Sequence, residues 1–254
     1  TCMERGWTGL GFMTVDIEQK WKEYTGVKNA HFVNSNTAGL HLALDVLKRR
    51  RGWADGDEVI TTALTFVSTN HAILYCGLTP VFADVDEYLC IDLASLLERI
   101  TDKTRAVMFV GIGGNVGRYL EVLEICRSRG IAVILDAAHM AGTRIDGHHV
   151  GPEADVAVFS FQAVKNLPTA DSGMVCFADD ADDALARRLS WLGISKDTYE
   201  RTHGGGAYKW MYDVDELGYK YMTAAGYNPR AFVETFRILA AAAQREPSKF
   251  ENLF

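Results

Sequence analysis

Short apolar runs alternate with longer amphipathic stretches along this chain, and the alternation strongly restricts the folds open to it. The apolar runs predict seven strands, at Ala30–Val33, Glu58–Thr61, Val81–Ala83, Ala106–Val110, Ala132–Leu135, Val156–Phe159 and Met174–Phe177. Helical patterns lie between them at Thr37–Arg50, Phe66–Tyr75, Leu93–Arg99 and Tyr119–Arg129. Strands that alternate with helices predict an α/β fold, and uniformly apolar strands suit a mostly parallel sheet that helices cover on both faces.

The charge balance excludes several classes of partner. The 254 residues contain 26 Lys and Arg against 33 Asp and Glu, a formal charge of −7. Binding nucleic acid or an anionic membrane requires a basic excess, so we expect neither partner. The apolar runs are too short to cross a bilayer. The five cysteines form no Cys-x-x-Cys pair, which argues against disulfides or a zinc site. We expect a soluble, cytoplasmic protein that binds no metal.

Polar or aromatic residues follow several predicted strands, at the sheet edge where α/β proteins bind ligands. Asn36, Thr37 and Ala38 open a helix. The free N–H groups and the dipole of a helix start can bind an anion, although a simple helix cap has the same composition. Phe66 follows another strand and offers a flat ring for a planar ligand, although most Phe residues belong to the core.

Two further strand ends carry ionisable groups. Asp136 and His139 follow an apolar strand, where a buried carboxylate needs a cation or several donors. One such use is to hold a protonated pyridine nitrogen, and the alternatives are a metal site or a helix cap. Ser160, Gln162 and Lys165 follow the strand Val156–Phe159. A lysine in apolar surroundings has a lowered pKa, as an imine-forming amine requires, whereas a lysine that extends from a surface loop does not.

Two other patterns allow competing interpretations. The glycine loop Gly111–Gly117 follows a strand and precedes a helix, as in dinucleotide sites, but Val116 stands where the third glycine of Gly-x-Gly-x-x-Gly belongs. We therefore favour a tight turn over an NAD(P)-dependent oxidoreductase. The adjacent His148 and His149 would point in opposite directions on a strand, so we predict a loop there and no metal site.

Taken in order, these blocks carry a family resemblance. The blocks are Asn36-Thr37-Ala38, Gly56–Ile60, Thr65–Thr69, Gly77–Val85, Asp136–His139, Val150-Gly151, Ser160-Phe161 and Lys165. They resemble the DegT/DnrJ/EryC1/StrS family of pyridoxal-phosphate-dependent sugar aminotransferases, which belongs to the fold type I group of the aspartate aminotransferase superfamily. The resemblance runs from about Ile17 to Tyr221.

The resemblance implies a homodimer that uses pyridoxal 5'-phosphate to move an amino group from glutamate to a nucleotide-linked keto-deoxysugar. Lys165 would form the Schiff base and carry a proton, and Asp136 would pair with the pyridinium nitrogen. Phe66 would stack on the cofactor ring, and His139 would lie near its phenolic oxygen. The remaining cofactor residues implied are Asn36 and, at the phosphate, Thr37, Ala38, Ser160 and Gln162.

The resemblance also implies the domain organisation. We expect a three-layer large domain with a helical N-terminal arm at residues 1–200, and a partial C-terminal region at 201–254. The segment Ala224–Phe254 departs from the family pattern, so the C-terminal small domain is predicted to be incomplete. Some members carry His in place of the Schiff-base lysine and catalyse a dehydration. Lys165 favours transamination, and a non-catalytic or dehydratase-type relative is the alternative.

Overall fold

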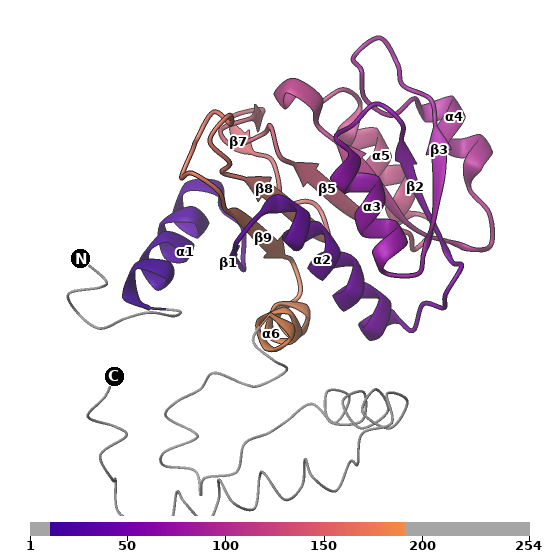
Figure 1. Cartoon of the computed structure of the whole chain (residues 1–254). Helices are drawn as coiled ribbons and strands as arrows, with labels where there is room; N and C mark the ends of the chain where they lie inside the picture. Colours follow the sequence, from indigo (N-terminus) through magenta and orange to yellow (C-terminus); the bar gives the residue numbers. More distant parts are fainter. Residues whose placement is uncertain (1–10, 191–254) are drawn as a thin grey trace, which may run out of the picture. The chain divides into compact units, whose positions relative to one another are not determined.

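A seven-stranded sheet forms the centre of residues 11–190, the part of the chain that the structure, a computed structural model, describes. Its strands are β1 (His31–Val33), β2 (Glu58–Thr62), β3 (Thr79–Ala83), β4 (Thr104–Val110), β5 (Ala132–Ala137), β8 (Val156–Ser160) and β9 (Gly173–Phe177). Their order across the sheet is β1-β9-β8-β5-β4-β2-β3 (Figure 1). Strands β3, β2, β4, β5 and β8 are parallel, and β9 runs antiparallel to both β8 and β1. The predicted α/β fold with a mostly parallel, mixed sheet is confirmed.

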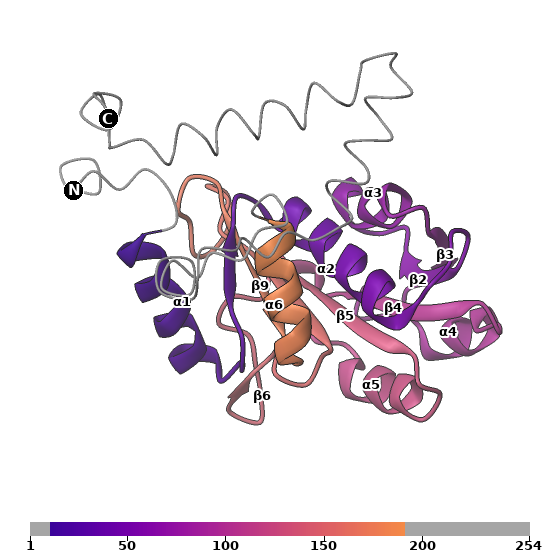
Figure 2. The ribbon, with the colours of Figure 1, turned by 90° about the horizontal axis from the view of Figure 1, so that it is seen from below.

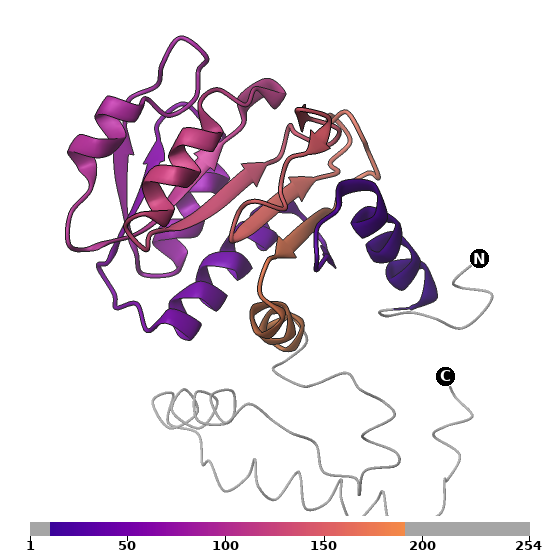
Figure 3. The same cartoon turned by 180° about the vertical axis from the view of Figure 1, so that it is seen from behind.

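Helices cover both faces of this sheet. They are α1 (Phe12–Thr25), α2 (Asn36–Arg51), α3 (Val67–Tyr75), α4 (Leu93–Arg99), α5 (Tyr119–Arg127) and α6 (Asp180–Leu189). Buried side chains of α2, α3 and α6 share one apolar core with residues such as Ile134 of the sheet. Those of α1, α4 and α5 share another core with residues such as Leu135. Adjacent residues of a strand point to opposite faces, so a strand that is apolar throughout contributes side chains to both cores. The sheet and the helices on its two faces form three layers (Figures 2 and 3).

The seven main strands lie within two residues of their predicted bounds. One helix start differs in a way that matters below. Phe66 is not the first residue of α3 but its extended N-cap, with φ −68° and ψ 142°. A helix, α1, is present where the N-terminal arm was predicted. The predicted domain boundary at residue 200 and the C-terminal region fall outside the described residues.

The prediction of a loop at His148 and His149 is wrong. The two residues form β7, which pairs with β6 (Arg144–Ile145) in a short antiparallel hairpin. Asp146 and Gly147 between them have positive φ values of 49° and 82°, the conformation that tight two-residue hairpin turns require. His148 is exposed, whereas His149 is buried and accepts the Gly142 N–H at 2.9 Å. None of the helices within residues 11–190 is long and apolar enough to span a membrane.

Candidate active site

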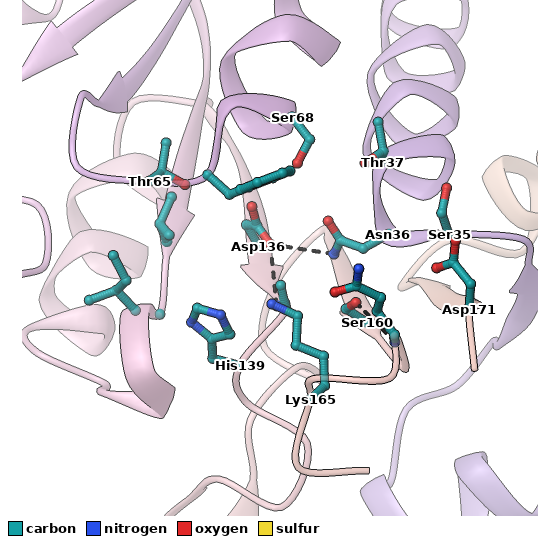
Figure 4. A pocket seen from close by; sticks show the side chains of 16 residues that line it. Ser35, Asn36, Thr37, Thr65, Ser68, Asp136, His139, Ser160, Lys165 and Asp171 are labelled. Atoms are coloured by element: carbon teal, nitrogen blue, oxygen red, sulfur yellow. Dashed lines mark hydrogen bonds between the residues drawn. The ribbon is translucent and has the colours of Figure 1, made fainter. Parts of the chain in front are cut away.

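A cavity of about 360 Å³ opens where strands β2, β4, β5 and β8 end (Figure 4). Parallel strands bring the residues that follow them to one edge of the sheet, which is where such folds bind ligands. Eight of the nine predicted cofactor-site residues line this cavity: Asn36, Thr37, Phe66, Asp136, His139, Ser160, Gln162 and Lys165. Residues as far apart in the sequence as Asn36 and Lys165 therefore meet at one site of a size that suits a small molecule.

Asp136 is a buried carboxylate at the end of β5, with 4% of its surface exposed. It accepts hydrogen bonds from Thr69 Oγ1 at 2.7 Å, from Ala138 N at 3.2 Å and from Asn36 Nδ2 at 3.4 Å. Burial raises the pKa of Asp136, and these three donors and nearby His139 act in the opposite direction. Within the described residues no cationic side chain forms a salt bridge with it. A buried carboxylate with neutral hydrogen-bond donors suits a ligand that brings its own positive charge.

The two side chains that donate to Asp136 come from two helices. Asn36 is the first residue of α2, and its side chain also donates to Val158 O of β8 at 3.0 Å. Helix α2 lies close to β8 because Gly39 has no side chain there: a Cβ at this position would come within 2.6 Å of Val158 Cγ1. Thr69 lies in the first turn of α3 and is 2.8 Å from Thr65 Oγ1. Thr69 was not among the predicted site residues, although it follows the predicted residue Phe66 by only three positions.

Lys165 lies in the loop between β8 and β9 and is half-buried. The Lys165 N–H donates to Gln162 O at 2.9 Å, which forms a tight turn. Two further backbone bonds close the loop, from Ala163 N to Ala170 O at 2.8 Å and from Thr169 N to Phe161 O at 2.7 Å. Figure 4 shows the amine end of Lys165 extending towards Asp136, with the His139 ring beside it. The loop therefore holds the amine at the buried end of the cavity.

Phe66 is unusually exposed for a large aromatic residue, with 74% of its surface accessible. As the extended N-cap of α3, it stands at the cavity and outside the apolar cores. An aromatic ring exposed in a cavity offers a flat apolar surface to a planar ligand. The lining also includes polar residues that we did not predict, among them Ser35, Ser68 and Asp171.

The start of α2 forms another part of the lining. Ser35 is the N-cap of the helix, and its Oγ accepts the Ala38 N–H at 3.1 Å. Ala38, the ninth predicted residue, does not line the cavity. Thr37 does line it and is exposed. Ser160, at the end of β8, also lines the cavity. A helix N-terminus with hydroxyl groups beside it favours an anionic group of a ligand.

His139 lines the cavity opposite these groups. The Gly113 N–H, from the 3-10 turn η1 (Ile112–Gly114), donates to Nδ1 of His139 at 3.0 Å. Burial lowers the pKa of His139, and the charge of Lys165 lowers it further, while Asp136 opposes both effects. The lowered pKa favours the neutral form of the His139 imidazole.

Residues 1–224 match the DegT/DnrJ/EryC1/StrS aminotransferase family, and the chain belongs to that family. This match confirms the predicted family and fold type. The family depends on pyridoxal phosphate, which confirms the predicted cofactor. The cavity fits this cofactor: it combines a buried acid that has no cationic partner among the described residues, an exposed ring, a lysine and a helix N-terminus. The alternative of a dinucleotide site at Gly111–Gly117, which we did not favour, is not supported by this family.

Three relatives illustrate the match. The spore coat polysaccharide biosynthesis protein SpsC of Bacillus subtilis (strain 168) is 39% identical over 219 residues, which are 86% of this chain and 55% of SpsC. DesI, whose crystal structure was analysed in the presence of its TDP-sugar product, is 32% identical in sequence to this chain, with a TM-score of 0.69. The match covers 76% of this chain and 48% of DesI. A mutant of the GDP-4-keto-6-deoxymannose-3-dehydratase ColD, with bound GDP-perosamine, is 25% identical, with a TM-score of 0.65, over 70% of this chain and 46% of ColD. The chain therefore spans about half the length of these relatives.

Proposed function

We propose that this chain carries the cofactor site of a sugar aminotransferase that moves an amino group from glutamate to a nucleotide-linked keto-deoxysugar. The observation that supports this most directly is the meeting of Lys165, Asp136 and Phe66 in one cavity, each from a different strand end. Pyridoxal phosphate, when bound, supplies a ring that accepts the electrons left on the substrate carbon when a proton is removed.

Each residue then has a role that follows from its surroundings. Asp136 offers its buried charge to the protonated ring nitrogen, and the side chains of Thr69 and Asn36 hold the carboxylate in place. Phe66 covers one face of the ring. Lys165 supplies the amine that attaches the cofactor, and the same amine, once free, moves a proton at the reacting carbon.

The other end of the cavity suits the phosphate. The N-terminus of α2 supplies a positive dipole end, and the hydroxyl groups of Thr37 and Ser160 supply donors. Gln162 and Asn36 line the same cavity, as do Ser35 and the acidic Asp171. The amide of Ala38 donates to Ser35 Oγ at 3.1 Å, so a role at the phosphate would require that bond to be exchanged.

The relatives support the proposed class of substrate. DesI was crystallised with a TDP-sugar product and ColD with GDP-perosamine, so both bind nucleotide-linked sugars. ColD is a dehydratase, and its resemblance to this chain makes dehydration the competing reaction. The presence of Lys165 in the cavity supports transamination instead, because an amine is what attaches the cofactor and returns the proton. A cytoplasmic homodimer is part of the same proposal, on the basis of the family resemblance.

The experiment that tests the proposal is reductive trapping. The chain is incubated with pyridoxal phosphate, reduced with borohydride and digested, and the modified peptide is identified by mass spectrometry. We expect the label on Lys165, none on a Lys165→Arg chain, and an unchanged label on the control Lys103→Arg, whose lysine lies outside the cavity. Label spread over surface lysines, or unaffected by Lys165→Arg, would contradict the proposal.

A further inference from the structure

The glycine loop between β4 and α5 has a geometry that the proposed cofactor chemistry does not explain. It contains the turn η1, in which Gly113 has φ 61° and Gly114 has φ 84°. Both values lie in the left-handed region, which glycine adopts without the strain that other residues incur. A Cβ at Gly113 would meet no atom within 4 Å, so conformation rather than space requires glycine there.

This loop is fastened to the chain segment that carries Asp136 and His139. The Gly111 N–H donates to Asp136 O at 3.2 Å, and Thr143 Oγ1 donates to Gly114 O at 3.2 Å. A Cβ at Gly111 would overlap the side chain of Met140, so the two segments are in close contact. The position of the loop therefore affects the position of the ionisable residues at the end of β5.

The third connection is the bond from Gly113 N to His139 Nδ1, at 3.0 Å. A backbone N–H can only donate, so the ring nitrogen that receives it carries no proton. A neutral imidazole with a bare Nδ1 has its proton on Nε2. This single amide therefore selects one of the two neutral forms of the ring.

The position of His139 gives that selection a consequence. His139 and Lys165 line the cavity described above, and both also line an adjacent hollow of about 580 Å³. Backbone of Gly113, Gly114 and Gly142 forms much of that second surface. His139 thus borders two spaces in which a ligand can lie, and the proton on its ring decides which ligand atoms it can bind.

We propose that Gly113 is a positioning residue that fixes His139 in the Nε2–H form, so that the ring presents a donor to the ligand. At this point the inference rests on the proposed function: the acceptor is then the phenolic oxygen of pyridoxal phosphate. A donor suits that oxygen, whereas the alternative tautomer would present a lone pair to it.

The test is nitrogen-15 NMR of the ligand-free chain labelled at histidine, because the two ring nitrogens have distinct shifts when one is protonated. The signals of His139 are assigned by their absence from a His139→Gln chain. Above the pKa of His139, we expect one bare and one protonated nitrogen, with the proton on Nε2. A proton on Nδ1 would overturn the proposal.

A matched pair of glycine variants then tests the role of Gly113. Gly113→Ala and Gly130→Ala introduce similar strain, because the φ values are 61° and 67° and neither Cβ would meet an atom within 4 Å. The Gly130 N–H donates to Arg127 O, away from the cavity. We expect Gly113→Ala to average the two ring-nitrogen shifts of His139, and Gly130→Ala to leave them unchanged. Unchanged shifts in Gly113→Ala would refute the role.

If Gly113→Ala does not fold, a second measurement addresses the same bond. Hydrogen exchange at the Gly113 amide should be accelerated by His139→Ala, which removes the acceptor, and an unaffected exchange rate would refute the bond. Both measurements use the chain without cofactor. Failure of reductive trapping at Lys165 would therefore count against the proposed function, and a wrong tautomer would count against this inference alone.

Discussion

Replacing Asp136 with Asn should stabilise the ligand-free chain. The carboxylate is buried and faces no cationic partner among the described residues. The substitution keeps the shape and the existing contacts: the amide oxygen can still accept from Ala138 N and Asn36 Nδ2, and the new NH₂ group can donate to Thr69 Oγ1, because a hydroxyl both donates and accepts. The Thr69 hydroxyl can in turn donate to Thr65 Oγ1, 2.8 Å away.

The size of the gain follows from what the charge costs. Burying an unpaired carboxylate costs several kcal/mol, and hydrogen bonds from neutral donors recover part of that cost. Two of the three donors to Asp136 are at 3.2 Å and 3.4 Å, so they recover little. We expect a net gain of about 1–3 kcal/mol in the free energy of unfolding, which for a chain of this size raises Tm by about 2–10 °C.

The pH dependence gives the sharper test. Burial raises the pKa of Asp136 in the folded state, so the folded chain holds that proton more tightly than the unfolded chain. Wild-type stability at this site is greatest below the ordinary value of about 3.9 and is lost as the pH rises through the raised folded-state pKa. The advantage of Asp136→Asn should be absent at low pH and should grow as the pH rises through the raised pKa of Asp136.

Thermal unfolding followed by circular dichroism at several pH values measures this difference. Asp57→Asn is the control with the opposite sign, because the hydrogen bond from Arg105 at 2.9 Å lowers the pKa of Asp57. That variant should be less stable than wild type at neutral pH, and its deficit should shrink as the pH falls. A destabilised Asp136→Asn chain, or a gain independent of pH, would refute the reasoning. In the loaded enzyme, the same change should slow turnover by orders of magnitude, because the ring nitrogen loses its charge partner.

Three further variants test the structure elsewhere. Ala170→Gly should raise the free energy of unfolding by about 1 kcal/mol in a denaturant titration, since Ala170 has a left-handed φ of 81°; a loss would contradict that conformation. Glu18→Gln should cost about 1–3 kcal/mol, because buried Glu18 binds Arg187 at 3.0 Å. Burial alone would raise the pKa of Glu18, but its partners hold the pKa below the ordinary value, so the deficit should fade as the pH falls through that lowered pKa. Gly39→Ala should lower the free energy of unfolding by about 1–3 kcal/mol, because the new methyl group would overlap Val158. Helix propensity alone predicts a gain of about 1 kcal/mol, so the sign of the measured change distinguishes the two effects.

The main elements of the fold were predictable because their signals are local. A strand such as β5 is buried along its whole length, and its apolar run marks it in the sequence. The hairpin of β6 and β7 was not predicted, because each strand has only two residues and no period can be recognised over that length. Strand order across the sheet depends on pairings between distant segments, which no local pattern determines.

The candidate site divides in the same way. Asp136 stands out because it directly follows a predicted apolar strand, and Lys165 because it lies in the loop after another such strand. Thr69 does not stand out, because its importance comes from a hydrogen bond to a residue 67 positions away. Asn36 was placed at the cofactor, but its amide contacts Asp136, 100 positions away, and Val158. Contacts of this kind depend on the assembled fold, so sequence patterns alone did not indicate them.

The pairing of β1 with β9 has a consequence for the order in which the chain can fold. His31–Val33 pairs with Gly173–Val175, so the first described strand in the sequence is connected to the rest of the sheet through the last described one. Helix α1 depends on equally late segments, since Trp21 packs against Phe159 and Phe161. During synthesis the early segments must therefore wait for about 140 residues to emerge before they find their partners. We expect closure of this edge to be the slow, high-contact-order step of folding, and the stage at which the incomplete chain is most exposed to aggregation and chaperone binding.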